Sequence, residues 1–418
     1  MRMLLLLTTL LIVCAAPALA GWTQDKFEIG AWRTPSAEFS TDDVYARMSS
    51  AGFTMLIGPP PEPGGNIDVN LRCLNLCQKY GMRLLVKDVR IHPDPQTDAD
   101  RNALDAMVGD YAGHPALYGY YIKDEPTPAA YRLLVEAHTY LKQKDPKHLP
   151  YINLFPNYGG PHQIEFADYD GYVADFVKTV KPLMLSYDHY SFLRDGRNRD
   201  NWFANLEVVR RDSLSAGIPM WVIIQALEDA TRYRPPTLNQ MYWQVNTSLA
   251  HGAKSIWYFP YWSAGEVNKP EEWHYLGVVM PDGKPGPQYE AACEINPKLK
   301  RLGPTLMGLK SVSVVHMGEV PLRAKGFRPD DLIADASGGR IVIGRFKDKL
   351  GEPVLMLVNR DWDDPGKVRL TLKQGSGVEE IGRLGPGKPF GPVRFDAQSK
   401  ELSVTLAPGE ARIIGIRD

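Results

Sequence analysis

Two hydrophobic patterns alternate along the first three quarters of the chain. Short runs rich in apolar and aromatic residues are separated by longer segments in which apolar residues recur every three or four positions. The first pattern is typical of buried β-strands and the second of amphipathic helices. The expected strands are Phe27–Trp32, Phe53–Ile57, Met82–Val86, Leu117–Ile122, Tyr151–Phe155, Leu183–Tyr187, Met220–Gln225 and Ser255–Phe259.

The longer segments are predicted to be helices, and several are followed by a glycine suited to a helix C-terminus. They are Asp42–Ala51, Val69–Tyr80, Ala99–Tyr111, Ala129–Lys144, Tyr172–Thr179, Asn201–Ala216, Leu238–His251 and Tyr289–Leu302. Alternating strands and helices in this number predict an α/β fold, a (β/α)8 TIM barrel. A doubly wound open sheet is the rival fold, but no glycine-rich phosphate loop follows the first expected strand.

The helical pattern stops near Ser311, and short alternating strands with Gly and Pro turns follow. These strands are expected at Val312–His316, Arg340–Phe346, Val354–Asn359, Lys367–Leu372, Glu401–Leu406 and Ala411–Ile416. We therefore expect a catalytic barrel at 21–310 and a C-terminal all-β sandwich domain at 311–418. The sandwich is expected to pack against the barrel; a sugar-binding role is the alternative.

The first 20 residues have the pattern of a secretory signal peptide. A basic start precedes the apolar run Leu4–Val13, and Ala18-Leu19-Ala20 forms a small-x-small cleavage site. We expect removal after Ala20 and a secreted or periplasmic protein without a membrane span. Three cysteines remain after that cleavage, Cys73, Cys77 and Cys293, and their spacing indicates neither a disulfide framework nor a metal site.

Two adjacent carboxylates end one of the expected strands. In Leu117–Pro126, LYGYYIKDEP, a buried strand opens into a loop at Asp124 and Glu125. Adjacent side chains of a strand point to opposite faces, so we do not expect a simple like-charge dyad. The C-terminal end of a barrel strand is, however, where catalytic residues of this fold lie.

The other strand ends are also polar or aromatic, whereas the opposite ends carry no comparable set. Sugar rings stack on flat aromatic side chains, and their hydroxyl groups bond to carboxylates, amides and Arg. We therefore expect a carbohydrate substrate, with no cofactor or metal. The expected substrate-binding residues are Trp32, Arg33, Lys87, Asp88, Arg90, Asn153, Tyr187, Asp188, His189, Gln225, Trp257, Tyr258 and Trp262.

On these residues the chain resembles the retaining clan-A glycosidases, which carry their acid/base after strand 4 and their nucleophile at the end of strand 7. The resemblance implies that Glu125 is the acid/base and Glu228 the nucleophile. It also implies that Trp257 or Trp262 floors the subsite of the cleaved sugar. The function so implied is that of a secreted glycoside hydrolase. The net charge of −1 without a basic stripe argues against a nucleic-acid partner, and the oligomeric state stays open.

One position departs from that clan, in which Asn usually precedes the acid/base. Here Asp124 stands before Glu125, and the pair resembles the substrate-assisted barrel hexosaminidases, in which the Glu is the acid and the Asp orients the substrate's acetamido group. Glu228 lies three residues beyond Gln225, so Asp188 is a further candidate for the second carboxylate. A non-catalytic carbohydrate-binding barrel is the alternative from another class.

Overall fold

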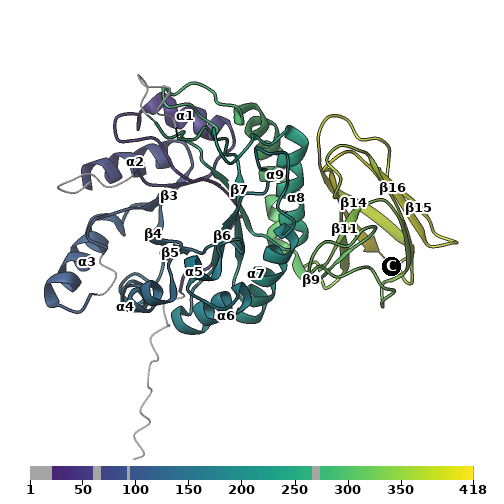
Figure 1. Ribbon diagram of the computed structural model, residues 1–418, viewed down its shortest axis with the longest axis horizontal. Helices are drawn as coiled ribbons and strands as arrows, with labels where there is room; N and C mark the ends of the chain where they lie inside the picture. Colours follow the sequence, from purple (N-terminus) through teal and green to yellow (C-terminus); the bar gives the residue numbers. More distant parts are fainter. Residues whose placement is uncertain (1–20, 60–66, 92–94, 266–273, 418) are drawn as a thin grey trace, which may run out of the picture.

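The computed structural model describes residues 21–59, 67–91, 95–265 and 274–417. The expected signal peptide at 1–20 lies outside the described residues. Figure 1 shows a barrel of strands surrounded by helices, with a smaller set of antiparallel strands packed beside it. The expected barrel followed by an all-β region is therefore confirmed.

Eight parallel strands form the barrel sheet, in the order β5-β4-β3-β2-β1-β8-β7-β6. A parallel bridge between Leu154 and Tyr187 joins the strands at the two ends of this order and brings the ring to closure. The strands are β1 (Glu28–Ala31), β2 (Met55–Ile57), β3 (Arg83–Val86), β4 (Leu117–Asp124), β5 (Leu149–Asn153), β6 (Leu185–His189), β7 (Met220–Gln225) and β8 (Ser255–Phe259).

Helices surround the barrel and cover the outward-facing side chains of its strands. Several begin at a Thr whose hydroxyl accepts a backbone N–H, as at Thr97, Thr127 and Thr237. The helices are α1 (Asp42–Ser50), α2 (Ile67–Lys79), α3 (Asp98–Tyr111), α4 (Pro128–Lys144), α5 (Pro161–Ile164), α6 (Tyr169–Val180), α7 (Trp202–Ala216), α8 (Leu238–Ala250) and α9 (Tyr289–Gly308).

Large aromatic side chains fill the interior of the barrel. Trp257 stacks on Trp221 with ring centroids 5.7 Å apart and on Tyr151 at 6.2 Å, and Trp32 lies against the same group. All four side chains are buried. This packing leaves room for no side chain at Gly30 on β1, where a Cβ atom would lie 1.8 Å from Cδ2 of Trp257.

Gly30→Ala is expected to destabilise the protein by about 3 kcal/mol, because the Trp257 ring is held by its neighbours and cannot move aside. Thermal or chemical denaturation measures the effect. The matched control is Gly109→Ala in α3, where a Cβ atom meets nothing within 4 Å and Ala favours the helix. Equal stability of the two variants would contradict the packing described for Gly30.

The C-terminal region consists of a four-stranded sheet, β10-β13-β16-β15, and a five-stranded sheet, β14-β17-β12-β11-β9. A second hydrophobic core lies between the two sheets. Helix α8 is buried between the barrel and this region, and Asn246 on α8 donates to the carbonyl oxygens of Leu384 and Gly409. The strands are β9 (Lys310–His316), β10 (Ile333–Gly338), β11 (Ile341–Lys347), β12 (Pro353–Asn359), β13 (Gly366–Leu372), β14 (Gly377–Leu384), β15 (Arg394–Asp396), β16 (Glu401–Leu406) and β17 (Ala411–Arg417).

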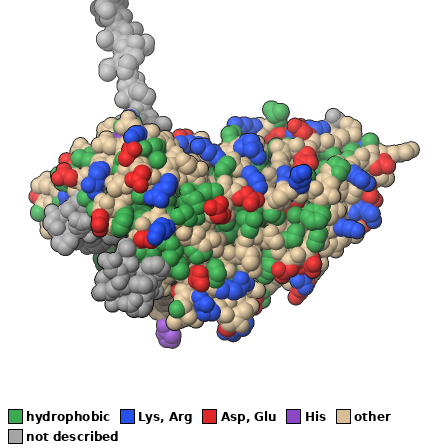
Figure 2. All heavy atoms as spheres, turned by 90° about the horizontal axis from the view of Figure 1, so that it is seen from above, with side chains coloured by type: hydrophobic (Ala, Val, Ile, Leu, Met, Phe, Trp, Pro, Cys, Tyr) green, Lys and Arg blue, Asp and Glu red, His purple; other side chains and the backbone are tan. Residues whose placement is uncertain are grey.

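Acidic and basic side chains are mixed over the face of the molecule shown in Figure 2, in keeping with the net charge of −1. Within the described part of the chain, no helix has the length and apolar character needed to cross a membrane.

Candidate active site

The backbone at the end of β4 is irregular in two places. The pairing of β4 with β5 shifts register between Tyr121 and Lys123, which is a β-bulge. Glu125 then adopts a φ of +45°, a left-handed conformation that is uncommon for a residue other than glycine. Such conformations concentrate at functional sites. Together these features redirect Asp124 and Glu125 away from simple strand alternation.

Asn153 at the end of β5 connects two carboxylates from neighbouring strands. Its Nδ2 group donates to Asp124 at 3.1 Å and to Asp188 at 3.0 Å, while its Oδ1 atom accepts the Ser186 hydroxyl at 2.8 Å. Glu125 forms a further side-chain hydrogen bond with Asp188. Three carboxyl groups at the ends of β4 and β6 are therefore linked, Asp124 and Asp188 by the Asn153 amide and Glu125 by Asp188.

The surroundings favour Glu125 as the protonated member of this group. Burial, the charges of Asp188 and Asp124, and the hydrogen bond to Asp188 all raise the pKa of Glu125. Burial and the charge of Asp124 also raise the pKa of Asp188, but hydrogen bonds from Asn153 and Glu125 favour its ionised form. A protonated Glu125 that donates to an ionised Asp188 satisfies both sets of interactions. Asp124 and Glu125 are not a simple like-charge dyad, since the hydrogen-bond partner of Glu125 is Asp188, but the charge of Asp124 also raises the pKa of Glu125.

Asp124 is a carboxylate that solvent reaches. Its side chain is exposed to solvent, yet the protein packed around it raises its pKa through desolvation. The mouth of the barrel therefore offers a carboxylate to a ligand from solvent.

Two cationic side chains from β1 and β3 accompany the carboxylates. Lys87 lies over the ring of Tyr121, with Nζ 4.4 Å from its centroid. Burial lowers the pKa of Lys87, the charge of Asp124 opposes that shift, and the charge of Arg33 adds to it. Arg33 has a φ of +58° and lies 5.5 Å from the ring of Tyr275. These expected binding residues therefore lie close to the carboxylates.

Half-buried aromatic rings border the same site and were not among the expected site residues. Tyr190, directly after β6, stacks on Phe259 with centroids 5.3 Å apart, and Phe259 contacts Tyr275 at 5.6 Å. The carboxylate charges raise the pKa of Tyr190, after the larger effect of its burial. Tyr190 and Phe259 both stand at the ends of expected strands, and this was the sequence signal for the surface.

Several other expected binding residues are occupied by interactions within the protein. Asp88 accepts hydrogen bonds from Arg90 and from Tyr111 on α3, and Arg90 also pairs with Asp110. These ion pairs and hydrogen bonds bind the loop after β3 to helix α3. It leaves neither Asp88 nor Arg90 free at the barrel mouth.

His189 and Gln225 also have structural surroundings. His189 is buried, hydrogen-bonds to Asn201 and Ser191, and has a pKa lowered to about 3 by burial, so it is neutral. The side chain of Gln225 bonds to the backbone of Phe192 at both its oxygen and its nitrogen. It holds the loops after β6 and β7.

Strand alternation places the remaining expected aromatic residues away from solvent. Trp32 and Trp257 fill the barrel interior. Tyr187 and Tyr258 face the helices, where the Tyr258 hydroxyl donates to Asn296 on α9 at 2.7 Å. Trp262 packs on Phe39, with centroids 5.0 Å apart, and is 6% exposed. None of these five rings presents an open face to a sugar in this structure.

Glu228 lies in the loop after β7. Its backbone pairs with Leu276, and its carboxylate forms an ion pair with Arg194 at 3.2 Å. Its side chain is 27% exposed, so solvent reaches it. The structure does not test its role as nucleophile, which stays a prediction. Among the described residues, no group of three His, Cys, Asp or Glu side chains is arranged to hold a metal ion.

Comparison with solved structures agrees with this architecture. A catalytic mutant of a GH42 β-galactosidase from G. stearothermophilus superposes with a TM-score of 0.59 at 9% identity, over 96% of this chain and 100% of that chain. A family 5 glycoside hydrolase from Bacteroides vulgatus gives 0.59 at 12% identity, over 94% and 90%. The β-galactosidase of Marinomonas ef1 gives 0.52 at 12% identity, over 69% of this chain and 63% of that chain.

These similarities define the chain as a (β/α)8-barrel protein with the fold of clan-A glycoside hydrolases, as the resemblance in sequence implied. At this level of identity they concern the fold and not the activity. No family model matches the chain, and no curated protein matches it in sequence.

Proposed function

We propose that the protein is an exported glycoside hydrolase whose general acid is Glu125. The observation that carries the proposal is the hydrogen bond of Glu125 to Asp188 within a group of three carboxyl groups. These neighbours keep Glu125 protonated at neutral pH, as a proton donor to a glycosidic oxygen must be. The likeness in fold to known glycoside hydrolases supports the same conclusion.

The surroundings of Glu125 suit the rest of the reaction. The transition state resembles an oxocarbenium ion, which neighbouring negative charge stabilises. Asp124 and Asp188 supply such charge beside Glu125. The rings of Tyr190 and Phe259 offer apolar surface against which a sugar ring packs.

Gln225 favours substrate assistance as the mechanism. In the clan that the chain resembles, the nucleophile lies at the end of strand 7. Here that position is Gln225, a buried amide bonded to the backbone. An acetamido group on the substrate would replace the missing nucleophile, with Asp124 to orient it. Double displacement through Glu228, whose carboxylate pairs with Arg194 through one oxygen, is the other candidate.

Aryl glycosides distinguish the two mechanisms. We expect turnover of a 4-nitrophenyl 2-acetamido-2-deoxyglycoside and little turnover of the matching glycoside without the acetamido group. Asp124→Asn should lower kcat by about 100-fold or more, because the acetamido group loses the carboxylate that orients it. Glu228→Gln should then retain most of the activity.

The reverse result supports double displacement. In that case Glu228→Gln loses activity, and both aryl glycosides are substrates. If neither the aryl glycosides nor a panel of polysaccharides is hydrolysed, the proposed function is wrong and the non-catalytic alternative gains support.

A further inference from the structure

A concave site lies on the sandwich, at its far side from the barrel. It is a hollow of about 400 Å³ on the outer face of the four-stranded sheet. Figure 1 places β15 and β16 of this sheet away from the barrel. The hollow is therefore separate from the carboxylate group of the barrel.

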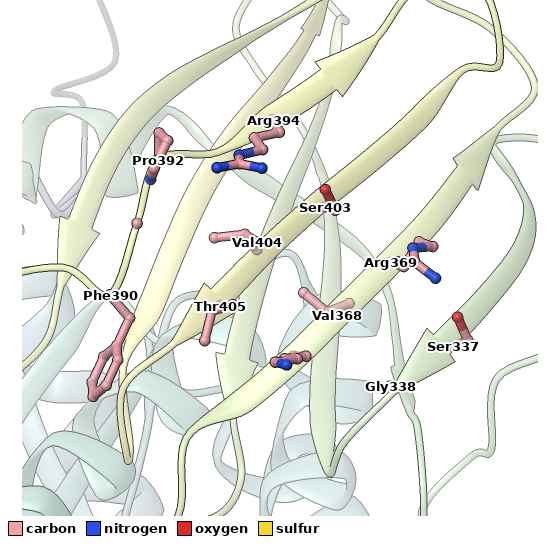
Figure 3. A pocket seen from close by; sticks show the side chains of 12 residues that line it. Ser337, Gly338, Val368, Arg369, Phe390, Pro392, Arg394, Ser403, Val404 and Thr405 are labelled. Carbon is pink, nitrogen blue, oxygen red and sulfur yellow. The ribbon is translucent and has the colours of Figure 1, made fainter.

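Strand register aligns basic and hydroxyl side chains across the floor of the hollow. Arg394 on β15 pairs with Ser403 on β16, Ser403 pairs with Arg369 on β13, and Arg369 pairs with Ser337 on β10. These four residues alternate between charge and hydroxyl across all four strands. Figure 3 shows them along the sheet, with Thr405 further along β16. With strands about 4.8 Å apart, the backbones of Arg394 and Arg369 are about 10 Å apart.

Lys367 extends the basic surface along β13. It pairs with Thr405 on β16, one side-chain repeat from Arg369. The acidic residues of this face lie at the other end of the sheet, where Glu401 pairs in register with Asp396. The face is therefore divided into a basic end and an acidic end.

Two of the three cations have no carboxylate partner. Arg369 pairs with Glu401 at 3.0 Å. For Lys367 and Arg394, the described residues provide no carboxylate within salt-bridge distance. These basic residues lie on β13 and β15, on either side of β16. An anionic ligand across this row would accept charge-assisted hydrogen bonds from both strands.

An aromatic ring stands at one side of the basic surface. Phe390 is 59% exposed, which is high for so large an apolar side chain. It lies in the loop before β15 and lines the hollow together with Pro392. An exposed ring beside hydroxyl groups suits the apolar face of a sugar, which hydroxyl and Arg side chains then bind at its edge.

We propose that this hollow binds an anionic polysaccharide, whose carboxylate or sulfate groups pair with Lys367 and Arg394 while a sugar ring packs on Phe390. The choice of a glycan rests on the proposed function of the barrel. The charge of the ligand rests on the hollow itself. Such a site would hold the barrel on a polymeric substrate without taking part in hydrolysis.

Binding to three soluble polymers tests the proposal. Hyaluronan carries carboxylates only, κ-carrageenan carries sulfates only, and dextran is neutral. Affinity electrophoresis or calorimetry should detect binding of the full-length protein to at least one of the two anionic polymers, weakened by salt, and none to dextran. The polymer that binds identifies the anionic group. Binding of dextran as tight as that of the anionic polymers, or no binding of either anionic polymer, would overturn the proposal.

The variants then locate the site. Lys367→Ala/Arg394→Ala and Phe390→Ala should each weaken binding by about tenfold or more. The matched control is Lys347→Ala/Lys373→Ala, which removes two exposed lysines of the same region from outside the hollow. Hollow variants that bind as tightly as this control would exclude the site.

Polymer binding by the hollow and hydrolysis by the barrel can be tested separately. Hydrolysis of a small aryl glycoside should be equal in the hollow variants and in the wild type, and Glu125→Gln should bind polymer normally. A protein that binds anionic polymer through the hollow and hydrolyses nothing would leave this inference standing and remove the proposed function.

Discussion

Replacing Glu125 by Gln is expected to lower kcat/KM for oligosaccharides by about 10²- to 10⁴-fold. Glutamine cannot protonate the leaving oxygen, although its shape fits the same space beside Asp188. A 2,4-dinitrophenyl glycoside has a leaving group that needs no proton, so its hydrolysis should fall much less. The difference between the two substrates, measured by steady-state kinetics, assigns the loss to proton donation.

The same variant should be more stable than the wild type at neutral pH. Burial and the neighbouring carboxylates raise the folded pKa of Glu125 from the ordinary glutamate value of 4.5 to about 10. The free energy of unfolding therefore falls as the pH rises from the unfolded pKa toward the folded pKa. In this range the native state retains a proton on Glu125 that the unfolded chain releases. Glutamine has no such proton. We expect its melting temperature to exceed that of the wild type by a few degrees at pH 7 and to match it near pH 4.

Glu165→Gln is the matched control for both measurements. Glu165 also has a positive φ, of 50°, but it lies on an exposed turn after α5. This variant should retain activity and show no pH-dependent gain in stability. If Glu125→Gln behaves as the control does in kinetics, Glu125 is not the general acid.

The barrel was predictable because the same hydrophobic pattern of strand and helix is repeated along the chain. Each strand is a buried run and each helix has its own apolar stripe, so an error at one boundary leaves the fold unchanged. In the sandwich, strands β10, β14 and β15 were missed. β10 reads IADASG, with little apolar alternation, and β15 has only three residues. Their pairing partners define them more than their own sequences do.

The sequence predicted which end of the barrel carries the site, but not which side chains contact one another there. Parallel strands bring their C-terminal ends together, and Asp124, Glu125, Asn153 and Asp188 do meet there. Their meeting depends on a bulge and a left-handed residue, neither of which periodicity reveals.

The same limit applies to the expected residues that do not join the site. A residue next to a strand end faces either the barrel axis or the helices, and a shift of one position exchanges the two. Tyr187 and Tyr258 face the helices for this reason. The pairing of Asp88 with Arg90 and with Tyr111 of α3 joins a strand end to a helix, which a linear pattern does not show.

Asp188→Asn is expected to move the alkaline limb of the kcat/KM profile to lower pH by roughly one unit or more. Glu125 donates its proton only while it is protonated, so activity falls as the pH rises through its pKa. The Asp188 charge and its hydrogen bond raise that pKa, and the asparagine removes the charge. Activity at acidic pH should persist, whereas on the alkaline side activity should fall at a lower pH than in the wild type.

The measurement is a pH profile of kcat/KM for the wild type, for Asp188→Asn and for Asp175→Asn. Asp175 is a carboxylate of α6 that bonds to Tyr131 and Arg132, and its variant should leave the limb in place. Glu125 and Asp188 share a hydrogen bond, so the apparent pKa values of the wild-type pH profile describe the two residues together. In Asp188→Asn the alkaline limb reports the titration of Glu125 alone. An alkaline limb that stays in place, or moves upward, would show that Asp188 does not control the proton on Glu125. The charge that holds that proton would then have to come from Asp124, which Asp124→Asn tests in the same assay.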